Sequence, residues 1–315
     1  MESYTEPIRK IAARLLKDCQ VEAVIGFRKG SVPMMNEPCI ITRADDADQL
    51  VWDGNCGINL ANYLTGRTGK IGIFAKGCDS RNIVTHILEN KVQRDQLVVV
   101  GVPCTGMIDK RRIREAAPGE ITEVEEDANN IRVRGRDFEE VYNRREMLQR
   151  NCRHCVHPNP VIHDELVADL VDEPTDVDPF EEVREIEAMD PEAKQQYFED
   201  LLAPCIRCYA CRNACPLCYC PTCFVDESMP QWVGKSQHPV DVWTFHFLRA
   251  YHCAGRCTDC GACERACPVG INMRLLTQKL NKDCFDHWGW EAGLSTDQRP
   301  ALDTYRPNDP EEFIK

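Results

Sequence analysis

The sequence predicts an α/β N-terminal domain with a mostly parallel sheet, followed by a smaller α-helical C-terminal domain. Two observations lead to this expectation. Residues 1 to about 150 alternate short apolar runs with amphipathic segments, which is the pattern of strands joined by helices. Beyond residue 204 the chain carries two cysteine runs, and the segment between them has apolar residues at helical spacing.

The first domain contains three apolar runs with the length and composition of buried strands. Strands are expected at 21–27, 70–75 and 97–102. Helices are expected at 8–16, 56–64, 79–90 and 136–150. Asn55 and Asp79 would cap the second and third of these helices. Residues 121–133 are expected to add antiparallel strands to this domain.

The two cysteine runs share one spacing, C-x-x-C-x-x-C-x-x-x-C-P, and lie at 205–216 and 257–268. In this pattern three cysteines hold one 4Fe–4S cluster, and the fourth, which precedes proline, ligates the other cluster. Eight cysteines at two identical spacings favour this interpretation over zinc or disulfides. The first cluster is expected on Cys205, Cys208, Cys211 and Cys267. The second is expected on Cys257, Cys260, Cys263 and Cys215.

Composition narrows the class of protein. Cysteine makes up 20 of the 315 residues. The first 20 residues carry charges throughout and have no apolar core, so they do not predict a signal peptide. No apolar run is long enough to span a membrane. We therefore expect a cytoplasmic protein, in which clustered cysteines indicate metal or redox chemistry.

The net charge of −13 lies in one acidic connector. Residues 164–200 contain 15 acidic and two basic side chains, so the rest of the chain is close to neutral. This charge argues against nucleic acid as a partner. The connector is expected to be either a solvated linker or a docking surface for a basic partner subunit. Within it, Asp190 and Pro191 predict the start of a helix that runs to Leu202.

These patterns divide the chain into four parts. The expected bounds are 1–160 for the α/β domain, 161–203 for the acidic linker and helix, 204–285 for the cluster-binding domain, and 286–315 for a tail.

A further C-x-x-C motif lies at 152–155. A third cluster would need four thiolates, and other cysteines of the first domain lie near expected strand ends or helix starts. The candidate ligands are Cys56, Cys104, Cys152 and Cys155, with Cys78 as the alternate. Two other interpretations stay open: a zinc site that includes His154 or His157, and buried thiols without a ligand.

The order Lys-Gly-Cys-Asp at 76–79, Val-Pro-Cys at 102–104 and Asn-Cys-x-x-Cys at 151–155 resembles the β-subunit family of deazaflavin-reducing hydrogenases and formate dehydrogenases. The resemblance covers roughly residues 20–170. It implies a flavin and iron–sulfur electron-transfer subunit in which Cys104, Cys152 and Cys155 belong to a cluster site. The chain departs from the family by placing its ferredoxin motifs at the C-terminus.

The expected turn between a strand and a helix at 75–81 is a candidate flavin site. Backbone N–H groups at such a junction can hold a phosphate. The candidate residues are Lys76, Gly77, Asp79 and Ser80, and FAD is the corresponding cofactor. The alternative is an ordinary tight turn, and the sequence has no glycine-rich dinucleotide fingerprint.

The second domain has a long gap between its motifs, since 41 residues separate Cys215 from Cys257. Helices are expected at 241–252 and 271–280. With these helices, residues 200–285 resemble the α-helical ferredoxin type of heterodisulfide reductase subunits and of fumarate reductase or succinate dehydrogenase iron–sulfur subunits. The remaining cysteines could form another metal site or pack as small buried hydrophobes, and they are Cys218, Cys220, Cys223, Cys253 and Cys284.

The sequence assigns no catalytic residue, because it shows neither a nucleophile triad nor a carboxylate pair. The predicted function is an iron–sulfur electron-transfer subunit of a cytoplasmic anaerobic oxidoreductase complex. It would relay electrons between a flavin or nicotinamide dehydrogenase subunit and a heterodisulfide-reductase-like, hydrogenase or formate dehydrogenase partner. One alternative is an FAD-containing catalytic subunit that exchanges a hydride with a nicotinamide or deazaflavin. The other is a structural metal-binding adaptor.

Overall fold

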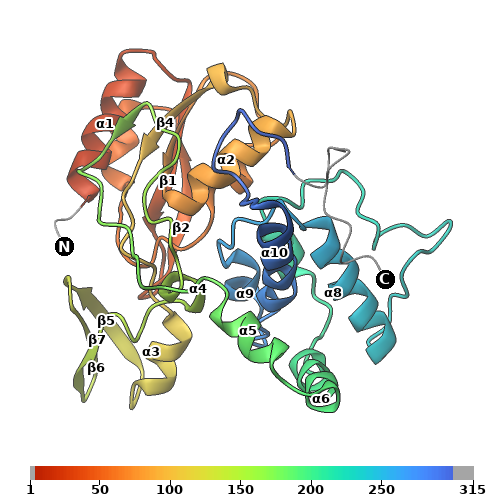
Figure 1. Cartoon of the computed structure of the whole chain (residues 1–315). Helices are drawn as coiled ribbons and strands as arrows, with labels where there is room; N and C mark the ends of the chain where they lie inside the picture. Colours follow the sequence, from red (N-terminus) through yellow and green to blue (C-terminus); the bar gives the residue numbers. More distant parts are fainter. Residues whose placement is uncertain (1–3, 301–315) are drawn as a thin grey trace. The chain divides into compact units, whose positions relative to one another are not determined.

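The computed structural model describes residues 4–300, and within them the chain forms two compact units (Figure 1). The first unit contains residues 4–80 and 91–177, and the second contains 81–90 and 178–300. One of the points where the chain passes between the units, 80–81, falls inside a helix. Part of the expected tail, residues 301–315, lies outside the described residues.

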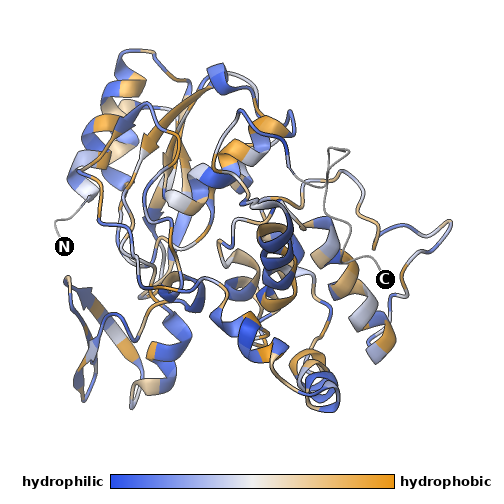
Figure 2. Ribbon diagram, in the orientation of Figure 1, coloured by the Kyte–Doolittle hydropathy of each residue, from blue (hydrophilic) through white to orange (hydrophobic). Residues whose placement is uncertain are grey.

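The first unit is built on a five-stranded sheet of order β2-β1-β3-β4-β8. The strands are β1 (Ala23–Lys29), β2 (Asn36–Ile41), β3 (Ile71–Ala75), β4 (Leu97–Gly101) and β8 (Glu165–Leu166). Only β2 is antiparallel to its neighbour, and the other pairs are parallel. All five residues of β3 are buried, as expected of a central parallel strand. The α/β fold class that the sequence predicts is therefore confirmed, and the central strands are coloured as apolar in Figure 2.

Helices flank this sheet along the chain. In α1 (Thr5–Lys17), Ile8, Ala12 and Leu15 share one face and are buried, and the helix packs on β1 and β3. The helix α2 (Gly77–Leu88) joins β3 to β4 and crosses the boundary between the units. Short 3₁₀ helices complete this part of the chain: η1 (Ala44–Gln49), η2 (Leu60–Tyr63) and η3 (Arg94–Gln96).

The prediction of a helix at 56–64 is wrong. Only η2 forms there, and Asn59 rather than Asn55 caps it by accepting a hydrogen bond from the backbone N–H of Ala61. The backbone N–H of Asn55 instead donates to Asp53 at 2.7 Å, which closes a turn. That turn keeps residues 53–56 out of a helix.

A second sheet of the same unit contains β5 (Ile121–Glu126), β6 (Asn130–Gly135) and β7 (Glu139–Asn143). It packs on α3 (Lys110–Ala116) through Ile113, Ile131 and Val133, and α4 (Arg150–Arg153) follows. The antiparallel pair expected at 121–133 is thus present. The helix expected at 136–150 is wrong, because most of that segment forms β7 and a turn. Its charges are paired across strands, as Glu139 is with Arg132 and Arg134.

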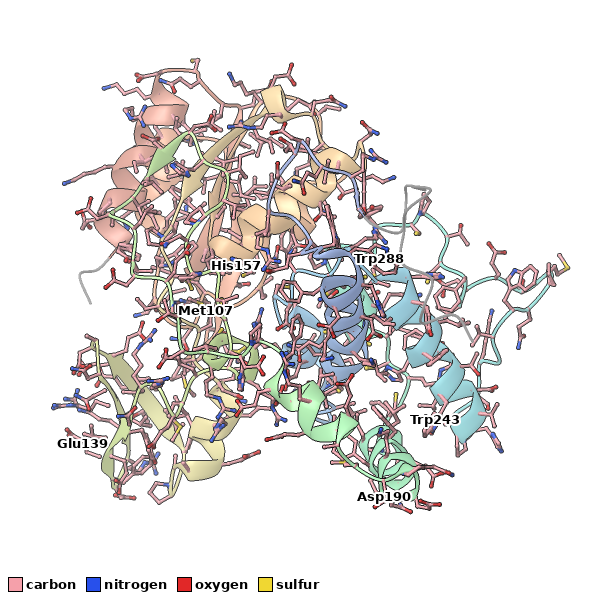
Figure 3. All side chains as sticks on the ribbon, in the orientation of Figure 1. Met107, Glu139, His157, Asp190, Trp243 and Trp288 are labelled. Carbon is pink, nitrogen blue, oxygen red and sulfur yellow. The ribbon has the colours of Figure 1, made fainter. Side chains whose placement is uncertain are left out.

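The second unit has no strand among residues 178–300 and consists of helices and loops. The helices are α5 (Glu181–Glu187), α6 (Pro191–Leu202), α7 (Ala210–Asn213), α8 (Pro239–His252), α9 (Ala262–Ala266) and α10 (Arg274–Trp288). Asp190 caps α6 by accepting from Ala193 N–H at 2.8 Å, as the sequence predicts (Figure 3). The core of this unit joins α8 to both cysteine runs, with Phe245, Ile271 and Met273 at its centre.

The acidic connector is folded into both units rather than remaining a free linker. Its first part forms β8, which pairs with β4, and its later part forms α5 and α6. Where the structure is described, no helix is both long and apolar enough to cross a bilayer.

Candidate metal centres

The first cysteine run and the last cysteine of the second run meet at one small cavity of the second unit. Cys205, Cys208, Cys211 and Cys267 all line it. Apolar side chains close the rest of the wall, among them Phe245, Ile271 and Met273. The four cysteines that the motif assigns to one cluster are therefore brought together in the fold.

A second cavity of the same unit shows the reciprocal arrangement. Its lining includes Cys257, Cys260, Cys263 and Cys215. Three of these cysteines come from the second run and one from the first. The crossed pattern that the spacing predicts is thus present in the positions of all eight cysteines, whereas their ligation of iron stays a prediction.

The two runs adopt the same local backbone. The third and fifth residues of each run have positive φ: 49° at Arg207 and 58° at Tyr209 in the first, and 53° at Asp259 and 68° at Gly261 in the second. This alternation turns the chain around the cavity, after which α7 and α9 begin. A non-glycine residue in this region costs about 1 kcal/mol or more. Hydrogen bonds from the Arg207 guanidinium to the carbonyl oxygens of Gly234 and Ser236 hold the first loop in place.

The helix α8, from the gap between the motifs, passes both cavities. Phe245 and His246 line the first, and Arg249 lines the second together with Cys253 at the end of the helix. With a rise of 1.5 Å per residue, about 10 Å of helix axis separates His246 from Cys253. The long gap therefore supplies a common wall for the two candidate metal centres.

The chemistry of both cavities fits iron–sulfur clusters. Burial raises the pKa of Cys211 and of Cys257 to about 12, so these thiols hold their protons when no metal is bound. Thiolates are the ligands of 4Fe–4S clusters, and metal binding releases such protons. The first cavity has four thiols and no carboxylate in its lining. Such a donor set suits iron–sulfur or zinc chemistry rather than a hard cation.

The additional cysteines of the second unit do not share one site. Cys253 packs with Cys215, Cys218 and Leu217 in a small buried cluster. Cys220 is exposed, and Cys284 is buried on α10. Among residues 4–300, no three His, Cys, Asp or Glu side chains are grouped as ligands of a single metal ion.

In the first unit, two loops place candidate ligands of the third cluster close together. The Sγ of Cys152 lies 3.4 Å from the backbone N of Met107, three residues beyond Cys104. The backbone N–H of Cys104 donates to the Pro158 carbonyl at 3.1 Å. Figure 3 labels Met107 and His157 on these two loops. Burial, and to a lesser extent charge repulsion from the nearby Cys152 thiol, raises the pKa of the Cys104 thiol to about 11.

Cys56 and Cys78 have different surroundings. Cys56 is fully buried, and its Sγ lies 3.4 Å from Asn36 Nδ2 and 3.5 Å from the backbone N of Asp53. Cys78 is partly exposed in the first turn of α2. The preceding Gly77 approaches the 152–158 loop so closely that a Cβ there would lie 2.1 Å from the His157 carbonyl oxygen. The fold thus holds Cys78 beside the loop of the C-x-x-C motif.

The polar side chains of the candidate phosphate-binding turn are bonded to other groups of the protein. Lys76, Asp79 and Ser80 are buried, and Lys76 Nζ lies 2.7 Å from Asp79 Oδ2. Asp79 also accepts the backbone N–H groups of Lys76 and Leu60. Ser80 Oγ donates to the Gly77 carbonyl at 2.8 Å and accepts from Val161 N–H. These contacts match those of a buried tight turn, the alternative that the sequence left open.

A larger cavity, of about 730 Å³, lies in the first unit and was not found from the sequence. Its wall includes Trp52, Pro103, Met107 and Arg144, and it also contains Cys104. Ligand cavities commonly have this size. Four carboxylates also line the wall, from Asp53, Glu125, Glu126 and Asp127, so the wall is more polar than that of a typical ligand cavity. The segment Pro103–Met107 follows β4, where ligands usually bind in parallel sheets, and that rule is the signal that could have located the site.

Comparisons with known proteins agree with this geometry. Residues 201–271 match the family described as 4Fe-4S dicluster domain. The chain is similar to the protein named F420-dependent formate dehydrogenase subunit beta of Methanocaldococcus jannaschii, with 22% identity over 93% of this chain and 92% of that protein. The beta subunit of F420-dependent formate dehydrogenase 1 of Methanococcus maripaludis is 26% identical over 31% of this chain and 24% of its own length.

Among solved structures, a chain of the F420-reducing NiFe hydrogenase complex from Methanosarcina barkeri has a TM-score of 0.38 and 13% identity. The match covers 48% of this chain and 58% of that chain. The two resemblances that the sequence indicated, one for each domain, are confirmed by the first relative and by the dicluster family.

Proposed function

We propose that this chain is an electron-relay subunit. The proposal starts from its resemblance to the β subunits of F420-dependent formate dehydrogenases and F420-reducing hydrogenases, and from its C-terminal 4Fe–4S dicluster domain. It carries electrons between a flavin or nicotinamide dehydrogenase activity and a formate dehydrogenase, hydrogenase or heterodisulfide-reductase-like partner in the cytoplasm. The names of its two relatives support a formate dehydrogenase over the other partners.

The observation that carries the proposal is the pair of four-cysteine cavities along α8. When bound there, 4Fe–4S clusters supply one-electron redox chemistry. The chain itself supplies the thiolates, the fixed separation along one helix, and apolar side chains such as Phe245 and Ile271 that keep water from the sulfurs. No side chain needs to act as an acid, base or nucleophile in such a relay.

Metal analysis of the anaerobically purified full chain tests this function. We expect about eight iron atoms per chain or more, which corresponds to two 4Fe–4S clusters. Cys208→Ser and Cys260→Ser should each lose a large part of that iron. Cys19→Ser is the matched control, because Cys19 is exposed and lines neither cavity. Iron near zero in the wild-type chain would refute the proposal.

A second candidate function is supported by the large cavity of the first unit. We propose that this cavity binds a flavin such as FAD, so that the chain also exchanges a hydride with a deazaflavin or nicotinamide. Trp52 and Met107 offer apolar walls for a planar ring. The guanidinium of Arg144, also in this wall, is already paired with Glu126 at 3.2 Å. The relatives' printed dependence on F420, a deazaflavin, supports this candidate.

Flavin analysis separates the two candidates. If the chain is also a hydride-transfer subunit, it should retain or take up FAD with visible flavin absorbance, and Trp52→Ala should weaken FAD binding while the iron content stays unchanged. A wild-type chain with full iron that neither contains nor binds FAD would leave the relay function standing alone.

We also propose a third cluster in the first unit, on Cys104, Cys152 and Cys155 with one further cysteine. The contact between Gly77 and the His157 carbonyl favours Cys78, rather than Cys56, as that fourth ligand. Cys78→Ser should then lower the iron content by about four atoms per chain, whereas Cys56→Ser should not. The opposite result would favour Cys56. Zinc in place of this iron would support the zinc interpretation.

A further inference from the structure

A buried guanidinium lies beside both candidate metal centres without an acidic partner. Arg249 is 4% exposed and lines the second cavity. Its Nη2 donates to the carbonyl oxygen of Cys211, a residue of the first cavity, at 3.2 Å. Its Nε is buried and makes no hydrogen bond. No carboxylate among residues 4–300 forms an ion pair with it.

A buried charge without compensation costs several kcal/mol, so proteins pair such charges or use them toward a bound ion. The groups that interact most strongly with the Arg249 charge are all cysteine thiols. They belong to Cys263, Cys215, Cys253 and Cys211. Among these, Cys211 lines the first cavity and the others line the second. The positive charge thus faces the candidate ligands of both clusters.

The other buried arginine at the second cavity shows the contrast. Arg274 is 1% exposed and is bound by three carboxylates, those of Asp259, Glu182 and Glu264. Its charge is more than neutralised by these partners, and it holds the Asp259 loop in place. The fold therefore gives one buried arginine carboxylate partners and leaves the other to face thiols alone.

We infer that Arg249 is a positioning residue that provides a shared counter-charge for the two clusters proposed above. A cluster with four thiolate ligands is an anion, and its reduction adds one more negative charge. A fixed positive charge nearby stabilises the reduced form more than the oxidised form, because the attraction grows with the charge of the anion. Arg249 therefore raises the reduction potentials of both clusters together. This inference rests on the proposed relay function.

The test compares full-length, anaerobically purified variants by redox titration monitored with electron paramagnetic resonance. Arg249→Met removes the charge and keeps an apolar stem of similar length. We expect the midpoint potentials of both clusters to fall, by a tenfold or greater change in each reduction equilibrium, which is 59 mV or more for one electron. Arg249→Lys keeps the charge and should retain most of the wild-type potential.

The matched control is Arg212→Met in the same unit. Arg212 lies beside Cys211 in the sequence but is partly exposed and paired with Asp226 at 2.9 Å. Solvent and Asp226 screen its charge, so both potentials should stay close to those of the wild type. If Arg249→Met lowered the midpoint potential of only one cluster, Arg249 would not act on both clusters. If Arg212→Met lowered both midpoint potentials as much, the effect would not be specific to Arg249. Either result would overturn the inference.

Other outcomes are also decisive. If Arg249→Met loses its iron, retention of iron by Arg249→Lys supports the counter-charge, and loss of iron in both variants overturns it. Full iron with unchanged potentials in Arg249→Met overturns this inference alone. A wild-type chain without iron overturns the relay function itself.

Discussion

The imidazole Nε2 of His246 lies 3.3 Å from the Sγ of Cys205. His246 is 3% exposed on α8 and lines the first cavity. Desolvation on burial lowers its pKa to about 4, and the charges of Arg249 and Arg207 add to this effect. The ring is therefore neutral near pH 7. A thiolate at Cys205 can only accept a hydrogen bond, so Nε2 would carry the hydrogen and donate it to the sulfur.

His246→Phe removes this donor and keeps an aromatic ring of similar size. Hydrogen bonds to cluster sulfurs raise the reduction potential, because they stabilise the more negative reduced form. We expect a lower midpoint potential for the first cluster only, measured by redox titration of the full chain. His252→Phe on the same helix is the control, since His252 packs on Phe224 and should leave both potentials unchanged. An equal shift in both variants would contradict the role of the hydrogen bond.

The crossed arrangement of the cysteines predicts which double substitutions are additive. Cys208 and Cys267 line the same cavity, whereas Cys215 lines the other. The Cys208→Ser/Cys267→Ser pair should therefore lose about four iron atoms per chain, no more than either single variant. The Cys208→Ser/Cys215→Ser pair should lose about eight. If ligation were not crossed, the first pair would lose about eight iron atoms and the second about four. The iron content of the two double variants therefore distinguishes crossed from uncrossed ligation.

Much of the fold could be predicted because its signals are local. Strands such as β3 are continuous apolar runs, and Asp190 followed by Pro191 marks a helix start that depends on no distant residue. The segment 136–150 shows the limit of such reasoning. Its many charges suggest a helix surface, but Glu139 is paired with arginines of the neighbouring strand. Cross-strand partners are invisible to a pattern read along one segment.

The candidate sites also include some residues that the sequence could predict and others that it could not. The spacing of the two cysteine runs was sufficient to predict which eight cysteines meet at two cavities. The roles of His246 and Arg249 could not be predicted, because the helix that carries them shows only an apolar stripe in the sequence. Likewise, the sequence leaves open whether residues 75–81 bind a phosphate or form an ordinary tight turn, because the 2.7 Å contact between Lys76 and Asp79 depends on how the segment folds.

The buried network around Arg274 predicts a large stability effect. Arg274→Met leaves the carboxylates of Asp259, Glu182 and Glu264 without their counter-charge. Breaking such a partly buried network costs about 3–5 kcal/mol. We expect a loss of this size in the free energy of unfolding, measured by anaerobic urea denaturation. Arg43→Met is the control, because Arg43 is a largely exposed partner of Asp45 and should have little effect. Equal losses in the two variants would contradict the argument.

Stability should also depend on pH through a buried histidine of the second unit. His86 is fully buried, and its Nε2 lies 2.7 Å from the Pro216 carbonyl oxygen, to which it must donate. Burial lowers the pKa of His86 below its ordinary 6.5, although the hydrogen bond with the Pro216 carbonyl opposes this shift. Between the lowered folded-state pKa and about 6.5, the unfolded chain binds more protons than the folded chain. The contribution of His86 to stability is thus complete above about pH 6.5 and is lost as the pH falls through this window.

His86→Gln keeps an N–H donor for the Pro216 carbonyl but cannot titrate. Compared with this variant, the wild-type free energy of unfolding should rise more steeply with pH in the window, by at most about 1.4 kcal/mol per pH unit for one proton. Above pH 7 the two curves should run parallel. Urea denaturation at several pH values measures both slopes. Other buried histidines such as His246 titrate equally in both proteins, so the difference between the curves isolates His86. Identical slopes from pH 5 to 7 would show that His86 keeps its ordinary pKa in the folded chain.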